Sequence, residues 1–390
     1  MRILLVADVS AEKVIGGAER MLVHHVRALM QSSEYELTVL TRQPQPDAPL
    51  VIDLGKGVSE YRLPFSGDKG LSGLLQLKRE AGIWWREHGA GFDAVIAEQP
   101  FVMWALLRAG CHLPRLQVCH SFAYQEYATR HGLDWGMKHR MITAAMRHLE
   151  GGIYRSAARV LMLSRHMRSE LQNCFGIPHE RVALAPGGVD LPTILSEQQR
   201  DGLRNELGWQ GPVVVTLRNL VPRTGVDMLI QAAAIVRNDM PDVRWCVVGS
   251  GALLEPLQWL ARQLKVQDII EFSGFLPEED VVRRLQAADA FMLPTRSLEG
   301  FGLVTIEANA CGLPVVATPV GGNVEVASSS PDNRVAEAVS PEAMAEALLA
   351  LLRQPVAHAE RAVRLRTHMA ENFSWPKHDR DFLTAVGEVV

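Results

Sequence analysis

The chain has 390 residues, of which 47 % are hydrophobic and 22 % are charged, and its formal net charge is −4. This length is more than one hydrophobic core usually serves, so we expect two domains, and the weakly acidic balance gives no reason to expect nucleic acid as a partner. The five cysteines are scattered without a C-x-x-C pair, which favours a reducing compartment over disulfides or a zinc site.

The amino-terminal half alternates short apolar runs with longer helical patterns. The first run, residues 3–7, is too short for a signal peptide and is typical of a strand buried on both faces. A helical pattern follows at 18–30, and further strands are predicted at 37–40, 94–97, 116–118 and 160–163. No apolar run approaches the roughly 18 residues that cross a bilayer. We therefore expect a soluble cytoplasmic protein that at most lies on the inner membrane surface.

The alternation is sharper in the carboxyl-terminal half. Strands are predicted at 213–217, 245–248, 269–272, 290–293 and 314–317, and helical patterns at 226–236, 253–264 and 341–369. Such repeats of strand and helix indicate parallel sheets covered on both faces, with ligands bound where strands end and helices begin. A polar stretch at 191–211 predicts the domain boundary near residue 190.

The most specific motif is the segment 297–326, SLEGFGLVTIEANACGLPVVATPVGGNVEV. We expect Glu299 in a loop and Glu307 inside the helix that begins near Leu303. Gly300 and Gly302 can adopt positive φ angles, and the amino terminus of the helix attracts an anion. Because a carboxylate can accept hydrogen bonds from two neighbouring hydroxyls, the segment predicts a site for a ribose or a hexose. Either glutamate alone would be read as a solvated residue after a glycine turn.

Two arginines follow the strand predicted at 213–217. Arg218 leaves the end of the strand, and Arg223 lies in the loop before the next helix. A guanidinium keeps its charge and offers fixed donors to phosphate oxygens. The pair is a candidate phosphate site, with two surface arginines as the alternative.

Other strand-to-helix turns give weaker signals. Gly16 and Gly17 open the first helix, and Gly249 and Gly251 follow a later strand, but neither pair fits G-x-G-x-x-G, so an ordinary tight turn is the alternative. His120 ends a strand and could donate to a sugar hydroxyl or a developing charge, with a structural histidine as the alternative.

No metal site or cofactor is expected. The only D-x-D is formed by Asp379 and Asp381 in a predicted terminal helix, and it is interpreted as a solvated pair. The sequence contains no H-E-x-x-H, no P-loop and no G-x-S-x-G. Metal-dependent sugar transfer of the D-x-D type is therefore not expected.

These segments together resemble glycosyltransferase family 4, whose members are retaining enzymes of the GT-B fold. The matching segments are GGAER at 16–20, the run at 156–171, APGGVD at 185–190, and those at 217–230, 247–257, 297–326 and 373–382. The resemblance covers nearly the whole chain and implies an α/β fold of two Rossmann-like domains facing each other across a cleft. The acceptor-side domain would span 1–190 with a crossing helix at about 375–390, and the nucleotide-sugar domain 191–374.

The resemblance also assigns roles to residues. It gives catalytic roles to His120, Arg218 and Glu299, with His120 near the reacting carbon of the sugar. Glu307 would hold the ribose, and Phe275 and Leu276 would flank the base. The whole donor set would be Gly16, Gly17, Arg218, Arg223, Phe275, Leu276, Glu299, Gly300, Phe301, Gly302, Leu303 and Glu307.

The implied activity is metal-independent, retaining transfer of a hexose from a nucleotide-diphosphate sugar. The acceptor would be a glycan, a lipid-linked sugar or a small glycoside, as in bacterial surface-polysaccharide biosynthesis. Two departures from the family are Thr224 in place of its usual lysine and Gly187 in place of its usual asparagine, and the segment 328–344 lacks the customary glycine-rich turn. They leave open a nucleotide-sugar epimerase of the same fold or a catalytically silent nucleotide-sugar-binding subunit.

One basic segment bears on the acceptor. Between 138 and 168 the chain carries Lys138, Arg140, Arg147, Arg155, Arg159, Arg165 and Arg168, with Trp135, Met137, Met141, Ile142 and Met146 within or beside them. This composition predicts peripheral contact with an anionic membrane or a lipid-diphosphate acceptor. A solvated helix packed by its apolar side is the alternative.

Overall fold

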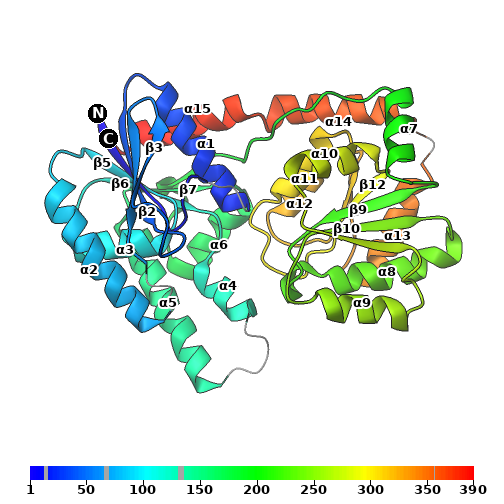
Figure 1. The fold of residues 1–390 in the computed structure, drawn as a ribbon, viewed down its shortest axis with the longest axis horizontal. Helices are drawn as coiled ribbons and strands as arrows, with labels where there is room; N and C mark the ends of the chain where they lie inside the picture. The colour runs from blue at the N-terminus through cyan, green and yellow to red at the C-terminus, as the bar shows by residue number, and fades with distance from the viewer. Residues whose placement is uncertain (13–15, 66–69, 131–135, 355) are drawn as a thin grey trace. The chain divides into compact units, whose positions relative to one another are not determined.

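The computed structural model describes the chain except for residues 13–15, 66–69, 131–135 and 355. It divides into two α/β units, each built on its own sheet (Figure 1). The first unit comprises residues 1–125, 135–186 and 378–390, and the second comprises residues 126–134 and 187–377.

The sheet of the first unit has the order β3-β4-β2-β1-β5-β6-β7-β8. Its strands are β1 (Arg2–Val6), β2 (Glu36–Arg42), β3 (Val51–Gly55), β4 (Val58–Leu63), β5 (Ala94–Ala97), β6 (Arg115–Cys119), β7 (Arg159–Met162) and β8 (Val182–Leu184). Strand β3 pairs antiparallel with β4, whereas β1 pairs parallel with both β2 and β5. The chain therefore leaves β1 in both directions across the sheet, which is the topology of a doubly wound fold.

Helices cover both faces of this sheet because successive residues of β1 point to opposite sides. Ile3 and Leu5 pack with α1 (Gly17–Gln31) and with Phe382 of α15 (Trp375–Gly387). Leu4 and Val6 pack with α2 (Leu71–His88) and α3 (Pro100–Arg108). Three further helices follow in this part of the chain: α4 (Ala123–Arg130), α5 (Met137–Ser156) and α6 (Arg165–Phe175).

The sheet of the second unit has the order β11-β10-β9-β12-β13-β14. Its strands are β9 (Val213–Leu217), β10 (Arg244–Val248), β11 (Ile270–Gly274), β12 (Ala290–Leu293), β13 (Val315–Ala317) and β14 (Arg334–Val335). All the paired strands described in this sheet run parallel. Since β10 and β11 lie on one side of β9 and β12 on the other, the topological switch point falls between β9 and β12.

Helices again cover both faces of the second sheet. One face packs against α8 (Val226–Asp239), α9 (Leu254–Gln263) and α13 (Pro341–Leu352). The other packs against α7 (Glu197–Glu206), α10 (Glu278–Ala287) and α11 (Leu303–Ala310). The short α12 (Asn323–Ala327) and the longer α14 (His358–Asn372) complete the unit.

Two local expectations from the sequence are corrected. The helical pattern at 341–369 is two helices, α13 and α14, because proline at position 355 lacks the backbone N–H that a continuous helix requires. The hairpin of β3 and β4 was not expected. Its outer strand, β3, is short and contains only exposed and half-buried residues, so the sequence has no continuous apolar run there.

Candidate functional site

Arg218 lies at the topological switch point of the second unit. It directly follows β9, and its backbone N–H donates to the carbonyl of Val248 at the end of β10. Gly249 makes this approach possible, because its φ is +133° and an added Cβ would lie 2.0 Å from the carbonyl oxygen of Arg218. The packing of β9 and β10 therefore fixes where the arginine leaves the sheet.

The Arg218 guanidinium forms a closed triangle with two residues that follow β12. Its Nη2 lies 3.1 Å from Oε2 of Glu299 and 3.0 Å from Oγ1 of Thr295. The Thr295 hydroxyl in turn donates to the same Glu299 oxygen at 3.1 Å. The sequence proposed both Arg218 and Glu299, and the structure places them in contact.

This triangle is almost closed to solvent, since the Arg218 side chain is 8 % exposed and that of Glu299 is 13 % exposed. Burial lowers the pKa of Arg218, the negative charge of Glu299 opposes that change, and the charge of Arg223 adds to it. The guanidinium remains cationic at neutral pH. Its Nε is buried without a hydrogen-bond partner among the described residues, so this donor is available to a ligand oxygen.

Arg223 shapes the loop that carries Glu299. Its Nη1 donates to the carbonyl of Leu298 at 3.2 Å, and its own carbonyl accepts from the N–H of Arg296. Leu298 has a φ of +59°, a left-handed conformation that few residues with a Cβ adopt. Arg223 thus holds the turn immediately before Glu299.

Thr224, at the position of the family's usual lysine, offers no free donor to a phosphate. It is buried, and its hydroxyl lies 2.8 Å from the carbonyl oxygen of Asn219 and 2.7 Å from that of Val221. Its hydroxyl is therefore committed to the loop itself. Of the two neighbouring positions, only Arg223 carries a cation.

The glycine turn predicted from the sequence leads into α11. Gly302 caps this helix with a φ of +93°, and a Cβ there would lie 2.4 Å from Oδ1 of Asn323. Oδ1 of Asn323 accepts from the Thr305 hydroxyl at 2.6 Å, so the first turn is held from the side. The free backbone N–H groups and positive dipole end of α11 are thereby placed directly after Glu299 and Gly300.

The remaining donor candidates of this unit differ in exposure. Phe301 is buried, and Leu303 and Glu307 are half-buried. The packing around Gly187 explains why glycine replaces the family's usual asparagine there. A Cβ at this position would lie 2.5 Å from the Leu303 side chain. After β11, the Phe275 ring is 72 % exposed and so is open to stacking. Leu276, in contrast, packs against the core.

In the first unit, the candidates lie beyond the carboxyl ends of β1 and β6. Gly16 and Gly17 are exposed at the amino terminus of α1, which Gly16 caps with an extended backbone. His120 follows β6, and its Nε2 lies 3.0 Å from Oε2 of Glu98, which follows β5. Gly16 and the two neighbouring strand ends thus belong to the same edge of this sheet.

Thr295 and Glu98 are two polar contacts of the site that the sequence analysis missed. Both come within two residues of a predicted strand end, at 290–293 and 94–97 respectively. That position was the available signal. Neither residue stands in a motif, so nothing in the sequence indicated its partner.

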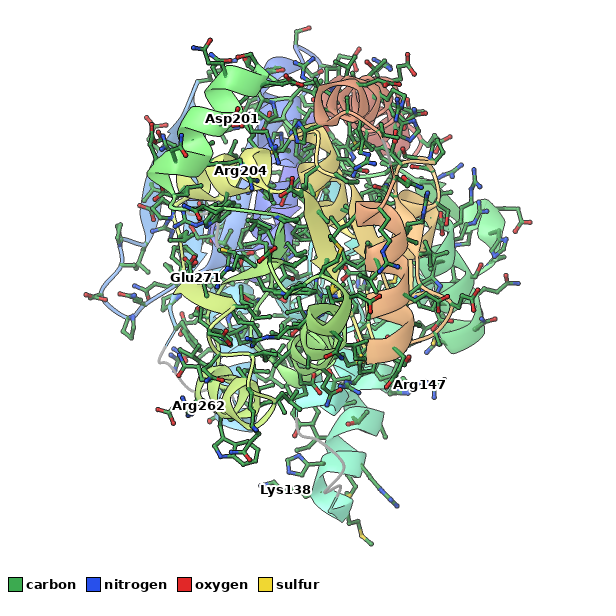
Figure 2. All side chains as sticks on the ribbon, turned by 90° about the vertical axis from the view of Figure 1, so that its right-hand side faces the viewer. Lys138, Arg147, Asp201, Arg204, Arg262 and Glu271 are labelled. Carbon is green, nitrogen blue, oxygen red and sulfur yellow. The ribbon has the colours of Figure 1, made fainter. Side chains whose placement is uncertain are left out.

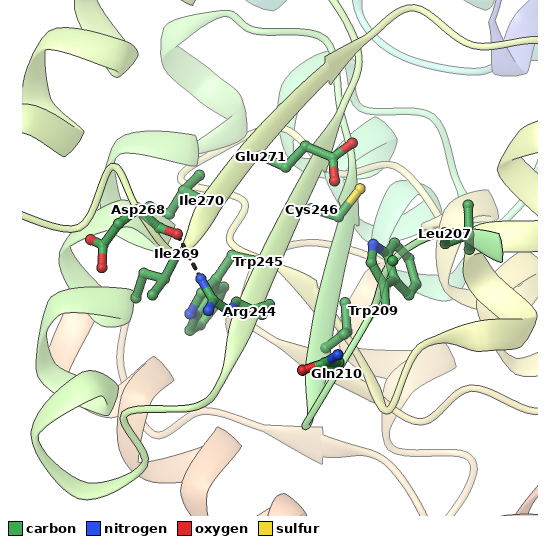
Figure 3. A pocket seen from close by; sticks show the side chains of 12 residues that line it. Leu207, Trp209, Gln210, Arg244, Trp245, Cys246, Asp268, Ile269, Ile270 and Glu271 are labelled. Atoms are coloured by element: carbon green, nitrogen blue, oxygen red, sulfur yellow. Dashed lines mark hydrogen bonds between the residues drawn. The ribbon is translucent and has the colours of Figure 1, made fainter. Parts of the chain in front are cut away.

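A separate cavity of about 300 Å³ lies at the opposite edge of the second sheet (Figure 3). It surrounds the amino ends of β10 and β11, where Arg244 donates to the carbonyl of Asp268 at 2.7 Å. Since this edge is remote from the carboxyl ends of the strands, the cavity is not part of the candidate site.

A second cavity, of about 470 Å³, opens beside α5 in the first unit. It is lined by Tyr124, Arg140, Thr143, Ala144, Arg147, His148, Arg155, Cys174 and Phe175, with no carboxylate among them. Arg147, labelled in Figure 2, lies over the Tyr124 ring at 5.8 Å. It also donates to the carbonyl of Cys174. Three arginines of the basic segment predicted from the sequence, Arg140, Arg147 and Arg155, therefore line a concave surface.

The apolar residues of that segment divide into two groups. Met137 and Met141 are 80 % and 67 % exposed on the first two turns of α5. Ile142 and Met146 are half-buried, as expected for residues that pack the helix against its unit. Trp135 lies outside the described residues.

No described helix is both long and apolar enough to cross a membrane. No group of three or more His, Cys, Asp or Glu side chains among the described residues could hold a metal ion. Asp379 and Asp381 lie on α15, and burial raises the pKa of Asp379.

Comparison with known proteins gives the family. The Glycosyltransferase Family 4 model matches residues 15–192, and the Glycosyl transferases group 1 model matches residues 199–372. The chain belongs to glycosyltransferase family 4. The matches include Gly16, Gly17 and His120 in the first region and Arg218, Glu299 and Glu307 in the second.

Solved structures share the fold of this family 4 chain over almost its whole length. A sucrose-phosphate synthase from Thermosynechococcus elongatus aligns with a TM-score of 0.83 at 20 % identity, covering 99 % of this chain and 98 % of its own. WaaG, a glycosyltransferase involved in lipopolysaccharide biosynthesis, aligns with a TM-score of 0.76 at 19 % identity, covering 99 % and 100 %. These similarities confirm the predicted GT-B fold class.

Curated relatives are more similar in sequence but match over shorter stretches. A GDP-mannose-dependent alpha-(1-6)-phosphatidylinositol monomannoside mannosyltransferase of Mycolicibacterium smegmatis is 34 % identical, over 63 % of this chain and 65 % of its own. A D-inositol 3-phosphate glycosyltransferase of Segniliparus rotundus is 34 % identical over 54 % and 50 %. The family 4 chain thus spans between half and two thirds of the length of these relatives.

Proposed function

We propose that the chain is a retaining glycosyltransferase that transfers a hexose from a nucleotide-diphosphate sugar. The observation that carries this proposal is the buried Arg218, held against Glu299 and Thr295 beside the amino terminus of α11. Breaking the glycosidic bond builds negative charge on the departing diphosphate. Fixed cationic and N–H donors at that position stabilise the transition state more than the ground state.

The other candidates follow from the chemistry of the donor. Glu299 and the backbone of residues 300–303 would contact the sugar and its phosphates, and Glu307 the ribose hydroxyls. The exposed ring of Phe275, with Leu276, would flank the base. Gly16 and Gly17 would approach the diphosphate from the first unit, and His120 would lie at the reacting carbon. Arg223 would supply the second cation that Thr224 does not.

We propose a lipid-linked acceptor at the inner face of an anionic membrane. The support is the concave basic surface beside α5, together with two exposed methionines on the same helix. Exposed apolar side chains next to cations are the composition of a membrane-surface helix. The mannosyltransferase relatives act on phosphatidylinositol mannosides, which gives the class of acceptor to test first.

The test is a panel of nucleotide sugars, beginning with GDP-mannose, each incubated with and without a phosphatidylinositol-type acceptor. Binding is measured by calorimetry, nucleotide release by a coupled assay, and the anomeric configuration of the product by NMR. Transfer with retained configuration supports the proposal. An isomerised sugar formed without acceptor would identify an epimerase, and binding without turnover would identify a silent subunit.

A further inference from the structure

A chain of buried histidine contacts stands behind His120 in the first unit. Glu98, 1 % exposed, accepts from His120 through Oε2 and lies 2.6 Å from Nδ1 of His25 through Oε1. Nε2 of His25, on α1, lies 2.9 Å from Nε2 of His378. Nδ1 of His378 lies 2.9 Å from the carbonyl oxygen of Pro186. Four side chains and one backbone carbonyl from separate parts of the chain are thus linked directly to one another.

The contacts fix where the protons lie, because a carbonyl oxygen can only accept. His378 must donate from Nδ1 to Pro186, and burial, followed by the charge of His25, lowers the pKa of His378 to about 3. The neutral ring of His378 therefore accepts at Nε2, so His25 donates to it from its own Nε2.

The same reasoning applies to Glu98. Burial alone would raise its pKa, but the charge of His25 and the hydrogen bonds from His120 and His25 outweigh burial and lower the pKa to about 2. Glu98 is therefore an ionised carboxylate that accepts from both rings. His25 consequently carries both of its protons and forms a buried ion pair with Glu98.

This arrangement orients the ring of His120. Its Nε2 faces the Glu98 carboxylate and donates to it, so Nδ1 is the ring nitrogen that lies outside this contact. Nδ1 is buried and has no hydrogen-bond partner among the described residues. The sequence analysis expected a hydrogen-bond donor at this position. An unprotonated Nδ1 would instead accept a hydrogen bond from a hydroxyl group of a bound sugar.

We propose that Glu98 is a positioning residue for sugar transfer, which fixes His120 as the neutral Nε2–H tautomer and presents Nδ1 as an acceptor to the donor sugar. This inference rests on the proposed function, which places His120 beside the sugar. A neutral ring suits that place, because an imidazolium would oppose the positive charge that develops on the sugar as the diphosphate leaves. A positive charge on His25 would not oppose the charge on the sugar in the same way, since the Glu98 carboxylate beside it neutralises that charge.

The network also joins His120 to two of the points where the chain passes between its units. The division between units falls after Pro186 and before His378, and these two residues are hydrogen-bonded to each other. His25 connects this pair to Glu98. The contacts of His120 therefore continue to residues next to two of these division points.

The first test reads the tautomer directly and requires no activity. The full chain, labelled with ¹⁵N-histidine, is studied by long-range ¹H–¹⁵N correlation at neutral pH, and His120 is assigned from its loss in His120→Asn. We expect Nε2–H and an unprotonated Nδ1 for His120, and two protonated nitrogens for His25. A His120 that carries its proton on Nδ1 would overturn the inference, whatever the activity of the chain.

The second test asks whether Glu98 acts through His120. Glu98→Gln should lower kcat about tenfold to a hundredfold with little change in the KM for the nucleotide sugar, and should shift the acidic limb of the pH profile. In the His120→Asn background the same change should have almost no further effect. Asp379 on α15 and His24 on α1 also interact electrostatically with the histidine chain, so their titration can contribute to the pH profile. The profiles of the variant and the wild type are therefore compared over the same pH range.

His112→Gln, an exposed histidine in the same unit, is the matched control and should leave kcat and the pH profile unchanged. Additive losses in Glu98→Gln and His120→Asn would overturn the positioning role while leaving the transferase proposal intact. A wild-type chain that transfers no sugar would overturn the proposed function itself and, with it, the role given to His120. If Glu98→Gln does not fold, the tautomer measurement on the wild-type chain still decides the inference.

Discussion

At the scale of single residues, the candidate site depends on a buried cation with a spare donor. The Arg218 guanidinium is held by Glu299 and Thr295 through Nη2, which leaves Nε without a described partner. An unpaired buried donor is costly to a folded protein, and such costs are concentrated where a ligand is bound. Replacing this one side chain is therefore the most direct test of the site.

Replacing Arg218 by alanine should lower kcat/KM, because it removes a fixed donor to the departing diphosphate. The expected decrease corresponds to a loss of roughly 2–4 kcal/mol of transition-state stabilisation. Steady-state kinetics with the donor found by the panel measure the effect. Arg353→Ala is the control, since Arg353 forms an exposed pair with Asp239 and should change little. Unchanged kinetics in Arg218→Ala would mean that the phosphate site lies elsewhere.

A second residue-scale prediction concerns His358, at the first position of α14. Burial, followed by the charge of Arg200, lowers its pKa from 6.5 to about 4. Between these pH values the unfolded chain binds the proton and the folded chain does not, so stability falls as the pH is lowered. The thermal midpoint of His358→Gln should therefore fall less than that of wild type from about pH 7 to about pH 5. The exposed His112→Gln should behave like wild type, and equal falls in all three would contradict the assignment.

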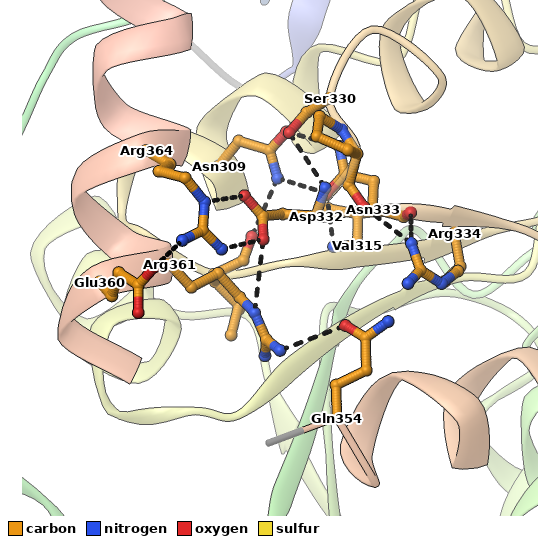
Figure 4. Close-up of polar contacts among 12 residues, drawn as sticks. Asn309, Val315, Ser330, Asp332, Asn333, Arg334, Gln354, Glu360, Arg361 and Arg364 are labelled. Carbon is orange, nitrogen blue, oxygen red and sulfur yellow. Dashed lines mark hydrogen bonds and ion pairs between the residues drawn. The ribbon is translucent and has the colours of Figure 1, made fainter. Parts of the chain in front are cut away.

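At the scale of elements, one amide pair holds α11 against the sheet (Figure 4). The side-chain amides of Asn309 and Asn333 donate to each other at 3.0 and 2.9 Å, and Oδ1 of Asn333 also accepts from the N–H of Val315. Beside them, Asp332 accepts from Arg364 of α14 through both carboxylate oxygens. The segment that lacks the family's glycine-rich turn thus ties α11 and α14 to β13.

Asn333→Ala should lower the free energy of unfolding by about 1–3 kcal/mol, because it removes the partner of two buried groups, Oδ1 of Asn309 and the N–H of Val315. Chemical denaturation followed by circular dichroism measures the change. Ser328→Ala, an exposed position shortly before it, should lie within about 0.5 kcal/mol of wild type. Equal stability of the two variants would mean that the amide pair contributes nothing.

Much of the element pattern could be predicted from the sequence because strands buried on both faces are uninterrupted apolar runs. The runs at 213–217 and 290–293 coincide with β9 and β12. The predictions failed where this signal is absent, as in β3, or where one residue interrupts a helical pattern, as between α13 and α14. Short apolar runs locate strands, but they do not locate half-exposed edges.

The site could be predicted in part for the same reason. Arg218, Glu299 and His120 follow strand ends, which is a property of the sequence, so they could be named without a structure. That Arg218 shares Oε2 of Glu299 with Thr295, or that Glu98 fixes His120, depends on strands far apart in the chain. Thr224 could be recognised as a departure, but its burial against the loop carbonyls could not.

At the scale of the molecule, the two units carry cationic groups with different roles in the proposed reaction. The second holds the cations for a nucleotide diphosphate, and the first holds the basic surface beside α5. A chain with a net charge of −4 attracts an anionic membrane only where its cations are gathered in one place. Membrane contact should therefore depend on this one surface and not on the total charge.

The chain should co-sediment with phosphatidylinositol-containing vesicles at low salt and release them at high salt. Reversing Arg140 and Arg147 together to glutamate should weaken partitioning about tenfold or more, since each cation near the surface contributes on the order of 1 kcal/mol. The control is Arg262→Glu with Lys265→Glu, which changes two exposed cations of the second unit, of which Arg262 is labelled in Figure 2. Wild-type protein that stays in solution with anionic vesicles at low salt would end the proposal of membrane contact.

Transfer should persist in EDTA, because Arg218, Arg223 and the amino terminus of α11 are expected to meet the diphosphate charge without a metal. Initial rates with and without chelator measure this. Loss of activity that added Mg²⁺ or Mn²⁺ restores would contradict the prediction and would require a metal bound with the donor.

The position of α15 has a consequence for biosynthesis. Its residues Phe382, Ala385 and Val386 lie in the same buried cluster as Ile3 and Leu22, so a helix synthesised after the second unit completes the core to which β1 belongs. Residues 187–377 form one uninterrupted stretch of the second unit. Since domains fold as units during translation, the second unit can reach its native state while the first still displays an open apolar face. The order of maturation is then the reverse of the order of synthesis, and that early face is where a chaperone would bind.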